Sequence, residues 1–345
     1  MSMPRRMHGV ALTGHGGYDR LQWRADLPVP EARRGEVLIR VAAAAVNNTD
    51  LNTRKAWYSK HDGAAQDGGW GGTPIAFPRI QGIDACGVVA AVGDGVDPGR
   101  LGERVLVEPC LWEIGGETLD RPGFLGSECD GGFAQYLVVA SRHAFKVDSA
   151  LSDVELASFP CSYATAENML TRAGVGANDT VLITGASGGV GSAAVQLAHA
   201  RGAAVVAACG ADKAEQVRQL GADRVLDRAA DGLAAACVDV VIDLVGGPHW
   251  PRWLDALRRG GRYAVAGAIA GAQAPLDLRT LYLNDLTFFG CTVLEPAVFP
   301  ALLKRIESGT VRPVIYAEYA LRDIVAAQQD FERKRGVGKI VLRVA

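Results

Sequence analysis

Two patterns of hydrophobic positions divide the chain. Up to about residue 145, short apolar runs are separated by Gly and Pro, for example at 36–42, 87–92, 104–107 and 133–139. Strands at this spacing predict an antiparallel, partly closed β domain. From about residue 160 to 293, apolar runs alternate with stretches that have helical periodicity. This alternation predicts βαβ units on a buried parallel sheet.

Individual elements follow from the second pattern and from the chain after it. We expect strands at 180–184, 203–208, 238–245 and 262–267, and helices at 190–201, 212–220 and 251–259. Beyond residue 293 we expect helices at 297–308 and 321–335 and a last strand at 339–344. Two Gly-rich stretches, 61–74 and 110–127, are predicted to be long loops, and loops of that length often bind ligands.

Length and composition limit the classes of protein to consider. A chain of 345 residues is long enough for about two domains, and its 49% hydrophobic content excludes general disorder. The formal net charge of −2 gives no reason to expect a nucleic acid or an acidic membrane surface as a partner. The sequence shows neither a signal-peptide pattern nor an apolar stretch that could span a membrane, so we expect a cytoplasmic protein.

The seven cysteines are scattered and include no Cys-x-x-Cys pair. Their spacing argues against a structural zinc site and against a disulfide framework. We therefore expect reduced thiols that mostly pack as small hydrophobic side chains.

A dinucleotide-binding turn is predicted between the first strand and the first helix of the parallel-sheet region. The segment 180–191 reads TVLITGASGGVG, with Ala186, Gly188 and Gly191 at the three positions of a G-x-G-x-x-G fingerprint. Such a turn lets the backbone approach a pyrophosphate, which the N–H groups of the following helix then bind. The residues assigned to cofactor binding in this turn are Ala186, Ser187, Gly188, Gly189, Val190 and Gly191.

The choice between NAD(H) and NADP(H) depends on the end of the second strand. An NAD site usually has an acidic residue there for the ribose 2′-hydroxyl, but this strand ends at Cys209–Gly210. Asp212 is expected to cap the next helix instead. Lys213 and Arg228 are the candidate cations for a 2′-phosphate, so NADP(H) is favoured, although Lys213 also fits a solvated helix position.

Eight motifs follow one another along nearly the whole chain: VNNTDLNTR (46–54), GIDACGVVAAVG (82–93), GERV (102–105), DGGFAQY (130–136), CSYAT (161–165), TGASGGVG (184–191), LGAD (220–223) and VGKIVL (337–342). In this number and order they resemble the medium-chain dehydrogenase/reductase superfamily, and most of all its zinc-independent quinone oxidoreductase (zeta-crystallin-like) branch.

The resemblance implies the domain organisation. It implies a GroES-like, partly closed β domain from 1–160 and 294–345, which would hold the substrate. A Rossmann domain with a doubly wound parallel sheet would cover 161–293, with an active-site cleft between the two. Relatives commonly form homodimers through the edge of the Rossmann sheet, which implies an edge strand at 286–293 here.

The resemblance also implies that a catalytic zinc is absent. Zinc-dependent alcohol dehydrogenases carry a Cys where this chain has Asn47 and a His where it has Ile83, so only Cys161 keeps a possible ligand. A catalytic zinc needs about three protein ligands. The four-cysteine lobe that holds a structural zinc in the family is missing as well. Cys161 is then expected to line the substrate pocket, with a reactive thiol as the alternative.

Without a metal to stabilise an alkoxide, the substrate has to delocalise the charge that develops during hydride transfer. Quinones and α,β-unsaturated carbonyl compounds do so. We expect hydride transfer from the nicotinamide to such a substrate, with the protein orienting the reactants and excluding water. Two alternatives stay open: an enoyl-thioester reductase, and an NADPH-binding protein with little turnover.

The remaining site residues each have a structural alternative. Asn47 is a candidate hydrogen-bond donor to the substrate carbonyl or a turn residue, and Tyr163 is a candidate proton donor or a core residue. Trp57, Tyr58 and Trp70 would line the pocket or pack a loop, and Asp50 is expected to be structural or to position the ribose. The resemblance places near the cofactor Thr165, Gly267, Phe289, Gly290 and Lys339.

Overall fold

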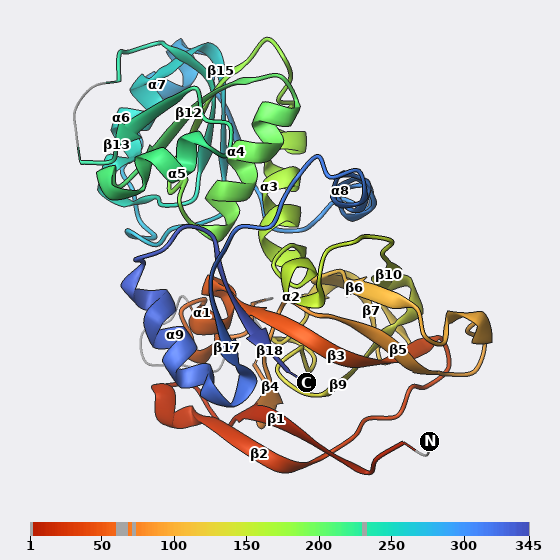
Figure 1. The fold of residues 1–345 in the computed structure, drawn as a ribbon. Coiled ribbons are helices and arrows are strands. Elements are labelled where there is room, and N and C mark those ends of the chain that lie inside the picture. The colour runs from red at the N-terminus through yellow and green to blue at the C-terminus, as the bar shows by residue number, and fades with distance from the viewer. Residues whose placement is uncertain (1–2, 60–67, 71–73, 230–232, 345) are drawn as a thin grey trace. The chain divides into compact units, whose positions relative to one another are not determined.

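The computed structural model describes residues 3–59, 68–70, 74–229 and 233–344, and its chain forms two compact units (Figure 1). The first unit comprises Met1–Cys161, Ile315–Arg335 and Lys339–Ala345. The second comprises Ser162–Val314 and Gly336–Gly338. The first unit is therefore built from both ends of the chain.

A largely antiparallel sheet forms the centre of the first unit. Within the described residues its strand order is β10-β6-β5-β3-β18-β17, and β9 also pairs with β3. The strands are β3 (Glu36–Val46), β5 (Cys86–Val92), β6 (Arg104–Val107), β9 (Tyr136–Ala140), β10 (Ala144–Lys146), β17 (Ile315–Ala320) and β18 (Lys339–Arg343). Ile340 of β18 pairs with Val46 at the end of β3. This register brings Lys339 to the point where Asn47 leaves β3.

Two smaller antiparallel sheets complete the β structure of this unit. In one, β1 (Arg6–Leu12) lies between β2 (Leu21–Pro28) and β4 (Arg79–Ile80). In the other, β7 (Cys110–Ile114) pairs with β8 (Glu117–Phe124).

The β7–β8 hairpin shows that the loop predicted at 110–127 is wrong. Its turn has Gly115 at a φ of +63° and Gly116 at a φ of +82°. Two successive left-handed residues make the tight turn that joins twisted antiparallel strands. The other predicted loop, 61–74, lies mostly outside the described residues.

Three short helices belong to the first unit: α1 (Asn48–Arg54), α2 (Asp153–Leu156) and α9 (Ile324–Arg333). Ile324 of α9 shares one buried hydrophobic core with Val46 of β3 and Leu342 of β18. The N-terminal and C-terminal parts of the chain therefore fold as one unit because they bury apolar surface together.

The second unit is built on a parallel sheet (Figure 1), with the order β13-β12-β11-β14-β15-β16 in the described residues. Its strands are β11 (Thr180–Ile183), β12 (Ala204–Cys209), β13 (Arg224–Asp227), β14 (Val238–Asp243), β15 (Leu257–Val265) and β16 (Thr287–Gly290). Its helices are α3 (Pro160–Arg172, which starts in the first unit), α4 (Gly189–Ala200), α5 (Ala214–Arg218), α6 (Trp250–Asp255), α7 (Leu278–Leu283) and α8 (Val298–Glu307). The order reverses between β11 and β14, and doubly wound sheets bind their ligands at such a point.

Several predicted elements have the right type and a different extent. The helix predicted at 251–259 ends at Asp255, because β15 already begins at Leu257. The helix predicted at 212–220 is a 3₁₀ turn followed by the short α5. The expected edge strand is present as β16, at the end of the strand order.

The segment 294–314, which the resemblance assigned to the β domain, packs in the second unit. Polar contacts tie it there. Arg305 of α8 pairs with the buried Glu167 of α3 over 3.5 Å. Further along, the Arg312 N–H donates to Gln196 Oε1 of α4 over 3.0 Å.

Two of the expectations from composition concern membranes and thiols. No helix in the described part of the chain is long and apolar enough to cross a membrane. All seven cysteines are described, and none of them forms a disulfide.

Candidate functional site

β11 leads into the predicted dinucleotide-binding turn, and α4 begins directly after it. Gly185 has a φ of +58°, and the Gly188 N–H donates to Gly185 O over 2.9 Å. Gly191 packs so closely on this turn that a Cβ there would lie 2.2 Å from Gly185 O. The last glycine of the fingerprint is therefore required by helix–turn packing.

The start of α4 offers backbone donors to an anion. The N–H groups of Gly189, Val190 and Gly191 precede the first intrahelical hydrogen bond, which Ser192 N donates to Gly188 O over 2.8 Å. Such N–H groups and the helix dipole favour a negative charge. The turn thus fits the pyrophosphate of a nicotinamide dinucleotide.

Ala186 and Ser187 have a supporting place in this turn. Ala186 is buried, and its N–H donates to Ala208 O of β12 over 3.1 Å. The carbonyl oxygen of Ser187 accepts from the Gly338 N–H over 2.9 Å. Both residues hold the turn in shape through backbone bonds.

A buried carboxylate that no motif in the sequence marks bonds to the residue at the start of this turn. Asp243, at the end of β14, accepts from Thr184 Oγ1 over 2.5 Å and from the Val245 and Gly246 N–H groups over 2.9 and 3.1 Å. The Tyr263 hydroxyl also donates to it. Burial and the Asp243 charge raise the pKa of Tyr263. These bonds fix the two loops that follow the adjacent strands β11 and β14.

The two candidate cations for a 2′-phosphate follow neighbouring strands. Arg228 comes directly after β13, and its N–H donates to Cys209 O at the end of β12 over 2.8 Å. Lys213 closes the 3₁₀ turn that follows β12. The structure therefore brings both residues to the carboxyl ends of β12 and β13.

Carboxylates share this edge of the sheet with the cations. Asp212 lies inside the 3₁₀ turn Ala211–Lys213, and the N-cap position of α5 is Lys213, so the predicted helix cap by Asp212 is wrong. Asp227 ends β13 and pairs in register with Cys209. Burial raises the pKa of the Cys209 thiol, and the charges of Asp212 and Asp227 add to the rise.

The other residues expected near the cofactor lie elsewhere in the second unit. Gly267 follows β15, and a Cβ there would lie 2.5 Å from Leu244 O, so only glycine fits. Phe289 and Gly290 end the adjacent strand β16. Thr165 is partly buried on α3.

A closed hydrogen-bond network lies in the first unit at the end of β3. Asn47 uses both amide protons, one donated to Asp84 Oδ2 over 2.7 Å and one to Ala45 O over 3.2 Å. The Lys339 ammonium donates to Asn47 Oδ1 over 2.5 Å, to Asp84 Oδ2 over 3.0 Å and to Val46 O over 3.2 Å. The three protons of the ammonium are therefore all used inside the network.

This network corrects two of the predicted roles. Asn47 has no amide proton left for a substrate carbonyl, because Asp84 and Ala45 accept both. Lys339 was expected at the cofactor, but its side chain is only 2% exposed and its ammonium is fully bonded in the first unit. In this structure the side chains of Asn47 and Lys339 bond to each other and to Asp84.

Asp84 also bonds to Cys161, another of the family's zinc-ligand positions. Its Oδ1 accepts from the Cys161 N–H over 2.6 Å, and its Oδ2 accepts from Asn47 and Lys339. Asp84 is completely buried, so its charge depends on these partners.

The residues present do not fit a catalytic zinc. Asn47 offers an amide that is already bonded, Ile83 has no donor atom, and Cys161 supplies one thiol. Within the described residues, no group of three or more His, Cys, Asp or Glu side chains could hold a metal ion. Zinc needs about three such ligands in one place.

Three aromatic residues predicted to line the substrate pocket do lie together. The ring centroids of Trp57 and Tyr58 are 5.5 Å apart, and those of Tyr58 and Trp70 are 6.2 Å apart. Trp70 also packs against Phe124 of β8. Burial raises the pKa of Tyr58 to about 12, although the Thr49 and Asn52 side chains bond to its hydroxyl and oppose the rise. The Cys161 and Asp50 charges contribute to the rise, so Tyr58 belongs to the same neighbourhood as the network.

Tyr163, the predicted proton donor, is a core residue. It is 1% exposed, its hydroxyl donates to Arg312 O over 2.6 Å, and it accepts from Gln196 Nε2 over 2.9 Å. Burial raises its pKa. Its proton is thus held inside the second unit, as the structural alternative required.

Asp50 lies beside the network on α1. Its two oxygens accept from the Asn47 N–H over 2.8 Å and from the Ile83 N–H over 3.2 Å. Burial raises the pKa of Asp50 to about 7, and the Asp84 charge adds to the rise, whereas Lys339 and the two N–H bonds oppose it. Its role is structural in that it ties α1 to the 82–84 turn.

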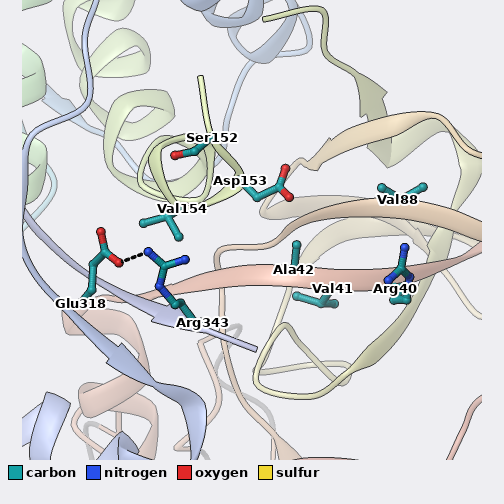
Figure 2. Close-up of a pocket in the computed structure, with 9 residues that line it drawn as sticks. All are labelled: Arg40, Val41, Ala42, Val88, Ser152, Asp153, Val154, Glu318 and Arg343. Atoms are coloured by element: carbon teal, nitrogen blue, oxygen red, sulfur yellow. Dashed lines mark hydrogen bonds and ion pairs between the residues drawn. The ribbon is translucent and has the colours of Figure 1, made fainter. Parts of the chain in front are cut away.

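A separate pocket of the first unit contains none of these residues. Figure 2 shows this cavity of about 420 Å³, lined by Arg40, Val41, Ala42, Val88, Ser152, Asp153, Val154, Glu318 and Arg343. The Arg343 guanidinium pairs with Glu318, and Asp153 pairs with Arg104 over 2.7 Å. The carboxylates are already neutralised by arginines, so we do not place the reaction here.

Two family models match the chain. The model described as an alcohol dehydrogenase GroES-like domain matches residues 33–149, and the model described as a zinc-binding dehydrogenase matches residues 189–308. The GroES-like match lies in the first unit and the dehydrogenase match lies in the second unit.

Individual proteins are similar over nearly the whole length. A quinone oxidoreductase from Lama guanicoe is 29% identical, with 98% of each chain covered. An acryloyl-coenzyme A reductase from Metallosphaera sedula is 30% identical, covering 97% of this chain and 99% of that protein. A solved structure from Sinorhizobium meliloti, described as a predicted alcohol dehydrogenase, has a TM-score of 0.90 at 41% identity, covering 99% of this chain and 97% of that one.

The raised pKa of Asp50 predicts a pH-dependent stability. Below about pH 4 both the folded and the unfolded chain hold this proton, and as pH rises toward 7 only the folded chain keeps it, so stability falls. Asp50→Asn removes this contribution. The free energy of unfolding of the variant, relative to that of the wild type, should therefore increase between about pH 4 and pH 7, by about 1.4 kcal/mol for each pH unit.

Urea denaturation of both proteins across this pH range measures the difference. Asp120→Asn, at an exposed position of β8, is the control and should follow the wild-type pH dependence. Parallel curves for Asp50→Asn and the wild type would show that the Asp50 pKa is not raised.

Proposed function

The chain belongs to the medium-chain dehydrogenase/reductase superfamily of nicotinamide-dependent oxidoreductases, in its quinone oxidoreductase branch, and from this premise we propose its reaction. It transfers a hydride from NADPH to a quinone or another conjugated carbonyl compound, without a zinc ion. The observation that carries the proposal is the closed network in which Asp84 and Lys339 bond to Asn47, the residue at one of the three zinc-ligand positions.

The protein's own contribution is binding, orientation and exclusion of water. The bound dinucleotide supplies the hydride. The turn at Gly185–Gly188 and the first turn of α4 hold its pyrophosphate. Trp57, Tyr58 and Trp70 form an aromatic surface suited to a flat, conjugated substrate.

Tyr58 is the hydroxyl that we assign to proton delivery. Its oxygen accepts from Asn52 Nδ2 over 3.5 Å, and the Thr49 side chain also bonds to its hydroxyl. A pKa raised to about 12 keeps it protonated at neutral pH. It is therefore able to donate to a carbonyl oxygen on which negative charge develops.

For the cofactor we propose NADP(H) over NAD(H). Support comes from Lys213 and Arg228, which lie at the carboxyl ends of neighbouring strands, where a ribose 2′-phosphate would need a cation. Asp212 and Asp227 oppose this preference, so the cations have to outweigh them.

A second candidate reaction is the reduction of an enoyl thioester. The similarity to the acryloyl-coenzyme A reductase over 97% of this chain favours it. Its chemistry is the same hydride transfer to a conjugated carbonyl, and its substrate differs in the thioester group.

We also propose a homodimer that forms through the edge of the parallel sheet. β16 is the edge strand, and four large hydrophobic residues of the preceding segment are between 59% and 64% exposed: Ile269, Leu278, Tyr282 and Leu283. Exposed apolar side chains and an open strand edge are both typical of an interface.

The proposed reaction predicts that the chelator-treated protein oxidises NADPH when a quinone or an enone is added. The loss of the reduced-nicotinamide absorbance measures it. A crotonyl thioester in the same assay distinguishes the second candidate, and an alcohol with NADP+ and added zinc is the control. Tight NADPH binding without turnover of any acceptor would instead favour a binding protein, and zinc-dependent alcohol oxidation alone would overturn the proposal.

Tyr58→Phe should lower kcat by up to about 100-fold, with a smaller change in KM, because only the proton donor is removed. Tyr163→Phe is the matched control. It should leave kcat unchanged and cost about 1 kcal/mol of stability, because its hydroxyl bonds to Arg312 O and Gln196 in the core. Equal kcat values for Tyr58→Phe and the wild type would exclude Tyr58 as the donor.

The double variant Lys213→Ala/Arg228→Ala should raise the Kd of NADPH about tenfold and leave the Kd of NADH unchanged, because only NADPH carries the 2′-phosphate. Fluorescence titration with both cofactors checks this. Lys304→Ala, at an exposed position of α8, is the control. Tighter binding of NADH by the wild type would mean that Asp212 and Asp227 govern the ribose site.

The double variant Leu278→Glu/Leu283→Glu should convert a dimer into a monomer, because each glutamate would bury a charge in the interface. Sedimentation velocity at micromolar concentration measures the change. The control is Leu101→Glu, at an exposed position of the first unit. A wild-type protein that sediments as a monomer contradicts the proposed interface.

A further inference from the structure

Three oxygen atoms surround the Lys339 ammonium, as oxygen ligands would surround a bound metal ion. Asn47 Oδ1, Asp84 Oδ2 and Val46 O lie at 2.5, 3.0 and 3.2 Å from Nζ. The side chains of Lys339 and Asp84 are 2% and 0% exposed. A charge this deeply buried requires a compensating charge, and here each ion is the compensation for the other.

The residues that accept from Lys339 are bonded to, or are themselves, residues at the family's zinc-ligand positions. Asn47 is itself one of these positions, and Cys161, the second, donates its N–H to Asp84 Oδ1 over 2.6 Å. Ile83, the third, immediately precedes Asp84 in the chain. Asp84 therefore bonds to two of the three positions and follows the third in the chain, and Lys339 neutralises it.

We propose that Lys339 is the resident cation of this site and that it excludes a divalent metal ion. Any metal held at positions 47, 83 and 161 would lie close to an ammonium that Asn47 already contacts, and the two like charges would repel each other. The pair also leaves no net negative charge at Asp84 to attract a metal. This inference does not depend on which substrate the enzyme reduces.

The test restores the missing ligands and then removes the cation. Asn47→Cys/Ile83→His and Asn47→Cys/Ile83→His/Lys339→Met are titrated with Co2+, using the ligand-field and thiolate charge-transfer absorption as the readout. We expect the triple variant to bind Co2+ at least about tenfold more tightly than the double variant. A second triple variant, with Lys146→Met at an exposed position of β10, is the matched control and should bind like the double variant.

Equal Kd values for the double variant and the Lys339→Met triple variant would overturn the proposal, as would a triple variant that folds and binds no Co2+. A second measurement covers a triple variant that fails to fold. Asp84→Asn, Lys339→Met and their combination are compared with the wild type by thermal unfolding. We expect the combined variant to lose less than the sum of the two single losses in Tm, and strict additivity would overturn the pairing.

Discussion

The buried ion pair between Asp84 and Lys339 is the interaction on which the first unit depends. Asp84 lies two residues before β5, and Lys339 begins β18 near the end of the chain. A carboxylate with no exposure needs a close cation or several hydrogen-bond donors in place of water, and for Asp84 the cation is Lys339. The pairing of β18 with β3 is thus required by electrostatics as well as by the shared hydrophobic core, and it explains why the C-terminal strand belongs to the unit that begins the chain.

The second unit holds a buried carboxylate in a different way. In the part of the chain that the structure describes, Asp243 is bonded by neutral groups: a threonine hydroxyl, a tyrosine hydroxyl and two backbone N–H groups. Neutral donors therefore hold the loops that follow β11 and β14 in position. In the first unit, a cation pairs with the carboxylate instead. The two buried carboxylates are thus compensated in different ways, although both are structural.

The sequence predicted what local patterns control. The alternating strands and helices of the parallel sheet and the glycine turn at 184–191 depend on neighbouring residues, and they appear where expected. The hairpin of β7 and β8 was missed, because its Gly content was taken as the mark of a loop when Gly115 and Gly116 in fact form a turn. Asp243 carried no signal, since its partners Thr184 and Tyr263 are distant in sequence.

Site roles were harder to predict than elements, because they depend on which partners a side chain meets. The assignments of Asn47 and Tyr163 as donors assumed free protons, and only the structure reveals that Asp84, Ala45 and Arg312 accept them. For Lys339, the family pattern identified the position, but its partners depend on the register between β18 and β3. A residue type at a known position therefore predicts chemistry only when the long-range pairing around it is also known.

The proposed zinc-free reaction and the closed network of Asn47, Asp84 and Lys339 have one joint consequence. A network in which every proton is used does not reorganise toward charge that develops on a substrate, so it offers little of the stabilisation that a metal would provide. The developing charge then has to spread within the substrate itself or be met by a proton from outside the network. Tyr58 adjoins the network without being part of it, and its aromatic neighbours present a flat surface. The bonding of the network thus supports the proposed preference for conjugated substrates as much as the aromatic surface beside it does.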